Sequence, residues 1–174
     1  MAAGVLYSCS GTTVEDVREY TETGPSPIRI TLNVTYEFTE AGKLKNELYA
    51  SRAEQYQEPD SSYSLLSGGF ILTFYDENVE FDGRLSAENG FIRGDNSMMI
   101  ARDSVVFVNR DNETLYTEEL IWVQDSAKVF TNKFVTIERE DDIIYGKGLI
   151  SDENFTNYII KSPTGTFFLT EEDE

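Results

Sequence analysis

Apolar and polar residues alternate along most of the chain, in short runs that polar turns separate. The clearest run is 28–38, IRITLNVTYEF, in which every second residue is apolar. A period of two is the spacing of side chains on one face of a β-strand. We therefore predict a half-buried strand over 28–38, with all its apolar side chains on a single face.

The block 101–148 repeats this pattern at an almost constant step. Its β-rich runs lie at 104–108, 115–123, 129–137 and 143–145. A small residue or a threonine holds a similar place in each unit: Ala101, Thr117, Thr131 and Gly146. The steps between them are 16, 14 and 15 residues. Such short, regular steps predict a stack of strand-turn-strand units.

The rest of the chain is also read as strands and turns. Residues 44–56 contain good helix formers, but 48–56 resembles the later segment 85–91, which favours a bent strand over a helix. The pair Gly68-Gly69 separates two apolar runs, as a bulge would. The pattern gives roughly 13 strands and predicts an all-β fold, with two stacked sheets or one folded, open β-jellyroll.

Charge restricts the partners. The 174 residues carry 32 acidic and 14 basic side chains, a formal net charge of −18. Nucleic acid is excluded as a partner, because its binding depends on Lys and Arg neutralising phosphates. Anionic lipid headgroups would be repelled as well, so any lipid would be held by its apolar part. Most of the acidic residues are expected to keep an exposed sheet soluble.

Candidate chemistry is sparse. The chain has no His and one Cys, which removes Ser/His/Asp and Cys/His catalysis and any intramolecular disulfide. The acidic pairs 118–119 and 141–142 are strand neighbours that point to opposite faces. The turns 76–78 and 111–113 offer oxygen ligands without the spacing of a calcium loop. We expect no catalytic site, no metal site and no cofactor.

The N-terminal segment MAAGVLYSCS resembles the end of a bacterial lipoprotein signal, in which Cys9 would be lipidated. The alternative is a chain end with an incidental cysteine. Pro25 and Pro27 favour an extended tether after it. The predicted organisation is a signal remnant and tether over 1–26, one β domain over 27–170 and an acidic tail over 171–174.

Apolar side chains in the predicted strands are the remaining candidates for a working surface. We predict that ten of them line one shared interior: Phe70, Leu72, Phe74, Phe91, Val106, Val108, Leu120, Trp122, Val135 and Ile137. An ordinary closed core would use the same residues. An open interior would instead bind acyl chains, because burying each CH₂ group is worth about 0.8 kcal/mol.

Four ordered segments carry a family resemblance. They are 99–109 (MIARDSVVFVN), 115–122 (LYTEELIW), 129–137 (VFTNKFVTI) and 144–149 (IYGKGL). Each motif alone is weak, but their order and spacing resemble the LptC family of the lipopolysaccharide export machinery. The resemblance is good over 85–158 and loose over 28–81.

The resemblance implies a twisted antiparallel β-jellyroll, open along one side, whose groove carries the acyl chains of lipid A. It also implies edge-to-edge strand pairing with neighbouring jellyrolls. The C-terminal edge, 157–169, would meet an LptA-like protein, and the N-terminal edge, 28–38, an LptF/LptG-type transporter. Gly146 and Gly148 would allow the close backbone approach and bend of the matching motif.

The resemblance further implies a non-enzymatic periplasmic adaptor attached to the inner membrane. The family has an N-terminal transmembrane helix, whereas this chain has a short apolar segment that ends at Cys9. A lipid anchor at Cys9 would take the place of that helix. Two other functions stay open: a periplasmic structural module with a closed core and no lipid cargo, and a glycan-binding surface lipoprotein with exposed aromatic side chains.

Overall fold

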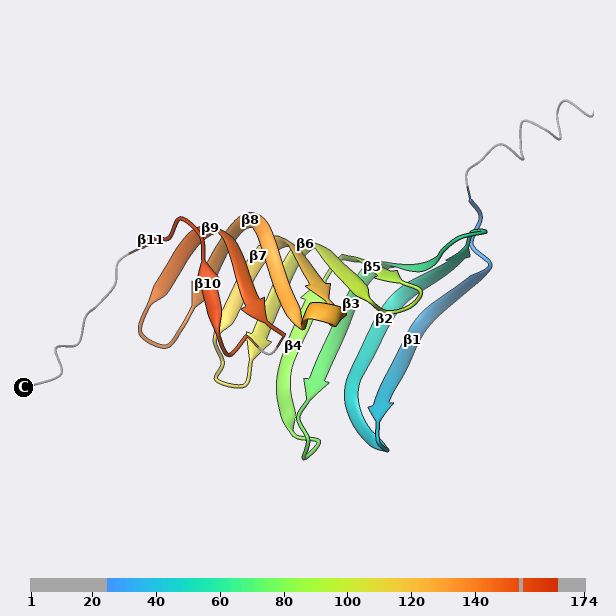
Figure 1. The fold of residues 1–174 in the computed structure, drawn as a ribbon, viewed down its shortest axis with the longest axis horizontal. Helices are drawn as coiled ribbons and strands as arrows, with labels where there is room; N and C mark the ends of the chain where they lie inside the picture. The colour runs from blue at the N-terminus through green and yellow to red at the C-terminus, as the bar shows by residue number, and fades with distance from the viewer. Residues whose placement is uncertain (1–24, 154, 166–174) are drawn as a thin grey trace, which may run out of the picture.

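The computed structural model describes residues 25–153 and 155–165 (Figure 1). Eleven strands account for most of this part of the chain. They are β1 (Arg29–Glu40), β2 (Lys43–Gln57), β3 (Ser62–Tyr75), β4 (Phe81–Ala87), β5 (Asn89–Arg93), β6 (Met98–Asn109), β7 (Thr114–Val123), β8 (Lys128–Glu138), β9 (Ile143–Asp152), β10 (Tyr158–Ile160) and β11 (Thr164–Gly165). A short 3₁₀ turn, η1 (Gln124–Ser126), is the one helical element within the described residues.

All strands belong to a single antiparallel sheet, which runs from β1 at one end to β10 and β11 at the other (Figure 1). β4 and β5 follow one another in the same gap between β3 and β6. The all-β prediction is therefore confirmed. Segment 44–56 lies in a strand, and the helical alternative for it is wrong. Glu118 and Glu119 lie within β7, Asp141 and Asp142 come just before β9, and the tail 171–174 lies outside the described residues.

The strand number differs from the roughly 13 predicted. β3, β6 and β9 each join two apolar runs that the sequence pattern separated. A bend between two runs interrupts the alternation without ending the strand, so one bent strand looks like two in the sequence. The last part of the predicted C-terminal edge, 166–169, lies outside the described residues.

A line of irregular residues crosses the sheet near the middle of its strands, and we call this line the crease. Its members shift the pairing register, have positive φ or, in the case of Glu88, separate β4 from β5: Asn33, Ser51, Gly68, Gly69, Glu88, Asp103, Ser104, Glu118, Glu119, Asn132, Lys133 and Gly148. Neighbouring members are bonded, since Gly69 N–H donates to the Glu88 carbonyl and Glu88 N–H donates to that of Asp103, both at 3.0 Å. Bulges bend a strand, so this aligned series folds the sheet into two facing halves.

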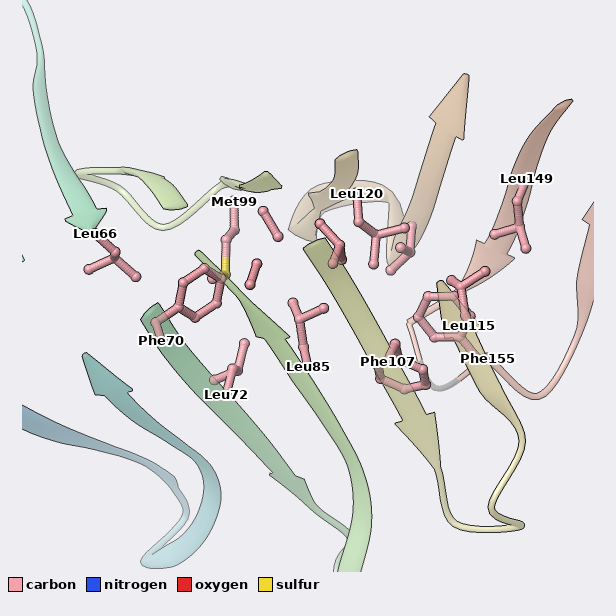
Figure 2. Packing of buried hydrophobic residues seen from close by; sticks show 14 of the residues in the cluster. Leu66, Phe70, Leu72, Leu85, Met99, Phe107, Leu115, Leu120, Leu149 and Phe155 are labelled. Carbon is pink, nitrogen blue, oxygen red and sulfur yellow. The ribbon is translucent and has the colours of Figure 1, made fainter. Parts of the chain in front are cut away.

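The two halves enclose the core. Directly paired residues form a row across one half: Leu48, Leu72, Leu85, Phe107, Leu115, Ile137 and Ile144. A second row crosses the other half: Ala53, Leu66, Gly90, Ala101 and Leu120. Nearly all of these side chains are buried, and Figure 2 shows members of both rows packed together. Each fully buried Leu, Ile or Phe contributes about 1.5–3 kcal/mol to folding.

The crease also corrects the prediction for 28–38. Asn33 has φ of 49°, and the alternation changes face there. Tyr36 pairs with the buried Leu48 and faces the interior, whereas Leu32 pairs with Arg52 on the outer face and is 61% exposed. The prediction of one shared face is therefore wrong, because a left-handed residue inside the run turns the earlier side chains outward.

Candidate functional site

The interior contains seven of the ten predicted groove residues. They are Phe70, Leu72, Phe74, Leu120, Trp122, Val135 and Ile137. The structure brings them together because the crease folds the two halves of the sheet over each other. Phe70 and Val135 are among the most completely buried side chains, whereas Phe74 and Trp122 are partly buried and stand at the margin of the core.

The other three predicted groove residues lie on the outer face of the sheet. Val106 and Val108 alternate with Val105 and Phe107, and it is the latter two that are buried. Phe91 stacks outside on Tyr63, with ring centroids 5.6 Å apart. The shared interior predicted for all ten is therefore wrong for these three. For Val106 and Val108 the reason is the bulge at Asp103 and Ser104, which sets which alternate positions of β6 point inward. Phe91 instead lies on β5 between Gly90 and Ile92, which both face the interior.

The interior is open at the β1 end. Two adjoining hollows of about 220 Å³ and 160 Å³ lie there between the halves of the sheet. We call them together the open groove; both are lined by Phe38, Leu48, Ile92 and Asn96. Sequence reasoning missed Phe38 and Leu48 as groove residues, although both stand at alternating apolar positions. The open groove is large enough for part of an apolar ligand.

Beyond the open groove the interior is packed. Leu72, Met99 and Trp122 line both the open groove and a further cavity of only about 20 Å³. That volume has room for about one water molecule. Phe107 and Phe155 line the same cavity, and Figure 2 shows Phe155 beside Phe107 and Leu115. The interior therefore has an open part near β1 and a filled part toward β9.

Trp122 supplies a polar group at the boundary of these two parts. Its indole Nε1 is buried and has no hydrogen-bond acceptor among the described residues. A buried donor without an acceptor is unfavourable by about 1–3 kcal/mol. A ligand that brought a carbonyl oxygen to this point would satisfy it.

Acidic side chains surround a wider mouth next to the open groove. This mouth, of about 450 Å³, is lined by Phe74 and Trp122 together with Glu40, Asp76, Glu77, Asp82 and Glu153. Lys45 is the one basic residue of its lining among the described residues. The charge at this entrance therefore opposes anionic groups and leaves the apolar interior to uncharged ones.

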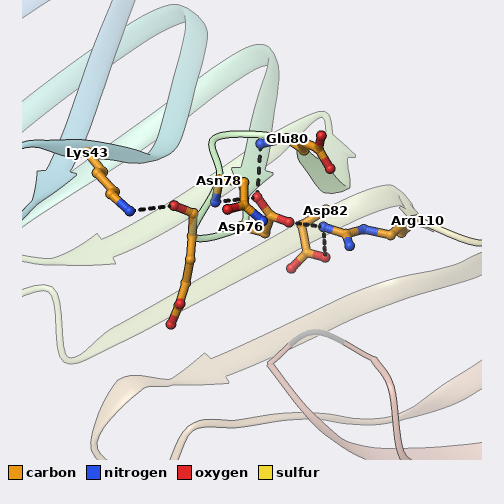
Figure 3. A network of polar contacts seen from close by, with 7 residues as sticks. Lys43, Asp76, Asn78, Glu80, Asp82 and Arg110 are labelled. Carbon is orange, nitrogen blue, oxygen red and sulfur yellow. Dashed lines mark hydrogen bonds and ion pairs between the residues drawn. The ribbon is translucent and has the colours of Figure 1, made fainter.

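Asp76 is fixed at this mouth by the network that Figure 3 shows. Its carboxylate accepts hydrogen bonds from the backbone N–H groups of Glu80 and Asn78, and Arg110 lies 2.7 Å away. These bonds, first that from Glu80 and then that from Arg110, lower the pKa of Asp76 to about 2. Arg110 also pairs with Asp82 at 3.3 Å, which ties the β6–β7 turn to the start of β4.

The side chains of the two oxygen-rich turns accept hydrogen bonds from their own backbone. Asp76 caps its turn as described, and the Asn109 side chain accepts bonds from the N–H groups of Asp111 and Glu113, both at 2.9 Å. Among the described residues, no group of three or more His, Cys, Asp or Glu side chains is placed to hold a metal ion.

The two ends of the sheet differ. β1 is a 12-residue strand that pairs with β2 alone among the described residues, whereas β10 has three residues and β11 two. Near the short end, Gly148 has φ of 94°, and Gly146 is packed directly under Ile160. Only the first of these glycines has a backbone conformation that other residues rarely adopt.

A single antiparallel sheet, folded along a crease over an apolar interior and open at one end, defines a β-jellyroll-like domain. The family model described as lipopolysaccharide-assembly, LptC-related matches residues 8–156. Because this match covers most of the chain, the protein belongs to the LptC family, as the four ordered motifs predict. A comparison with curated proteins finds no match.

Family membership implies a role in lipopolysaccharide transport, and the LptC family is a periplasmic component associated with the inner membrane. No helix in the part of the chain that the structure describes is long and apolar enough to cross a membrane. Cys9 and the tether over 1–26 lie largely outside the described residues, which begin at residue 25.

Proposed function

We propose that this LptC-family protein is a non-enzymatic adaptor that receives the acyl chains of lipopolysaccharide from an inner-membrane ABC transporter and passes them to an LptA-like bridge. The open groove is the observation that carries the proposal. It places Phe38, Leu48 and Ile92 around a hollow that solvent can enter at the β1 end of the interior. Apolar chains would be held there without any charged contact.

The surroundings of the open groove suit the acyl part of a lipid. The acidic mouth would keep phosphate groups outside by repulsion. The free N–H of Trp122 would donate to the ester or amide carbonyl that begins each acyl chain. The groove and Trp122 together therefore favour acyl chains with an ester or amide carbonyl over hydrocarbon chains without one.

The edges of the sheet support the two partner contacts. β1 offers a long row of backbone groups to a strand of an LptF/LptG-type transporter, and residues 157–169 would offer the opposite edge to an LptA-like protein. Lipid entering at β1 would then leave toward β10. A lipid anchor at Cys9 would hold the N-terminal end of this path near the inner membrane.

A second candidate, a structural module without cargo, is favoured by one observation. The interior between β6 and β9 is filled, and its remaining cavity of about 20 Å³ cannot hold an acyl chain. Such a module would join its neighbours through the same two edges. The two functions differ only in whether lipid ever enters the interior.

Site-specific photo-crosslinking to lipopolysaccharide separates these functions. A benzophenone amino acid at Phe38, Phe74 or Trp122 faces the groove or its mouth, whereas one at Val108 or Phe134 faces outward. We expect lipid adducts at the first three positions and none at the last two. Absence of adducts at all three inner positions, in protein that still binds its neighbours, would reject the lipid-carrying function.

A further inference from the structure

Phe155 occupies the interior in an unusual way, because it does not belong to a strand. It comes from the turn between Asp152, the last residue of β9, and Tyr158, the first of β10. The flanking residues Glu153 and Thr156 are exposed, yet Phe155 itself is only 5% exposed. A turn from the outside of the fold thus sends a single aromatic ring into the interior.

The ring fills the space between the two halves of the sheet. It stacks on Phe107 of β6, with ring centroids 4.0 Å apart and an angle of 26° between the planes. It also lines the cavity of about 20 Å³ that adjoins the open groove. In Figure 2 Phe155 lies next to Leu115, and Leu149 of β9 lies beyond them.

Local bonds hold the turn in this position. The Asp152 carboxylate accepts hydrogen bonds from Thr156 N–H at 2.8 Å and from Asn157 N–H at 3.1 Å. The backbone of Phe155 has φ of 53°, a left-handed conformation that is unfavourable for an aromatic residue. The conformation is therefore maintained by the Asp152 cap and by burial of the ring.

Phe155 consequently stands across the route that an acyl chain would follow. Leu48 lines the open groove on the β1 side, and Leu72, Met99 and Trp122 connect that groove to the cavity under Phe155. On the far side lie Leu115 and the β9 edge, toward which the proposed transfer runs. With the ring in place, the far part of the interior has no room for a chain.

We propose that Phe155 is a displaceable plug, whose ring holds the place of an acyl chain until lipid passes toward β10. This proposal rests on the proposed lipid-carrying function. Exchange of a phenyl ring for a hydrocarbon chain keeps the site apolar and well packed. The bonds that must break are those of the β9–β10 turn, whereas the ladder that joins β6, β7, β8 and β9 stays intact.

The test measures lipid contact on each side of the ring in the full chain. A diazirine analogue of leucine, close to leucine in size, replaces Leu48 in the open groove or Leu115 beyond the plug. Purified lipopolysaccharide is the probe. We expect strong labelling from position 48 and weak labelling from position 115, and Phe155→Ala should raise labelling from 115 several-fold while leaving that from 48 nearly unchanged.

Two further variants keep the result interpretable. Asp152→Ala releases the turn while the ring is retained, and it should raise labelling from position 115 in the same direction but by less. Phe134→Ala, which removes an aromatic ring that is 58% exposed, serves as the matched control and should change neither position. Urea titration of each variant shows whether it is folded.

Each outcome separates the two proposals. One outcome is that position 48 is labelled and that labelling from position 115 is the same in the wild type, Phe155→Ala and Asp152→Ala proteins. That outcome overturns the plug and leaves the lipid-carrying function standing. Strong labelling from 115 in the wild type also overturns the plug. Absence of labelling from both positions in every folded protein rejects the lipid-carrying function, and the plug with it.

Discussion

Gly146 on β9 lies directly under Ile160 on β10, so close that a Cβ atom on Gly146 would overlap Cγ2 of Ile160. The Lys161 carbonyl would stand 3.0 Å from the same Cβ. The short strand β10 can therefore close this end of the interior only because position 146 has no side chain. The family resemblance singled out this glycine, and the structure supplies a steric reason for it.

We expect Gly146→Ala to weaken the attachment of β10 and to lower the free energy of unfolding by about 1–3 kcal/mol, since overpacking of this kind costs that much. Urea denaturation followed by tryptophan fluorescence measures the change. Ile160→Ala provides the matched test, because it removes the atom that the new Cβ would meet.

In the Ile160→Ala background, the added cost of Gly146→Ala should be clearly smaller than in the wild type. A double-mutant cycle gives this difference directly. If the effects of the two substitutions were simply additive, contact with Ile160 would not be the reason that position 146 requires a glycine.

Acid should weaken the turn that Asp76 caps. The pKa of Asp76 is about 2 in the folded protein, against an ordinary value of 3.8. A lowered folded pKa means that the carboxylate stabilises the fold above its unfolded pKa and that this contribution is lost as the pH falls through the folded pKa. The loss should therefore fall between about pH 4 and pH 2.

Asp76→Asn removes the titrating group, so its urea midpoint should lie below that of the wild type at neutral pH and approach it by about pH 2. Arg110→Gln should reproduce only part of this behaviour, because the backbone bond from Glu80 is the larger cause of the shift. A difference between wild type and Asp76→Asn that stays constant over the whole range would contradict this account.

Trp122→Phe should discriminate between lipids by their linkage. The substitution keeps an aromatic ring and removes the buried Nε1 donor. We expect it to weaken binding of ester-linked acyl chains by about tenfold, the equivalent of a 1.4 kcal/mol hydrogen bond, and to leave ether-linked chains of equal length nearly unaffected. Competition binding with matched ester and ether lipids measures the ratio.

Equal weakening for both lipids would show that Trp122 acts through its size alone. Phe74→Leu is a useful comparison, because Phe74 lines the same mouth without a polar atom. It should shift both affinities together.

Period two in the sequence was sufficient to predict an all-β chain and most of its strands, because side chains of paired strands alternate between two faces. It was not sufficient to say which face is the inner one. The run 104–108 shows why: Val106 and Val108 look as suitable as Val105 and Phe107. The bulge at Asp103 and Ser104 decides between them, and two polar residues within a strand do not by themselves specify a bulge.

Phe155 shows a different limit. It is a single aromatic residue in the polar segment SDENFTN, and no periodicity connects it with the core. Its burial depends on Phe107, 48 residues earlier in the chain, which reaches it only after the sheet has folded along the crease. Long-range contacts of this kind leave no local signal. The four ordered motifs, in contrast, were enough to identify the family.

The crease also determines what the interior can do without unfolding. The irregular residues are aligned across neighbouring strands, so the crease can act as a hinge between the two halves of the sheet. Rotation about the crease would widen the interior while the strands within each half keep their hydrogen-bonded pairing. Amide hydrogens in both halves should then exchange slowly even while the interior binds an acyl chain. Within the sheet, exchange should be fastest at the residues of the crease.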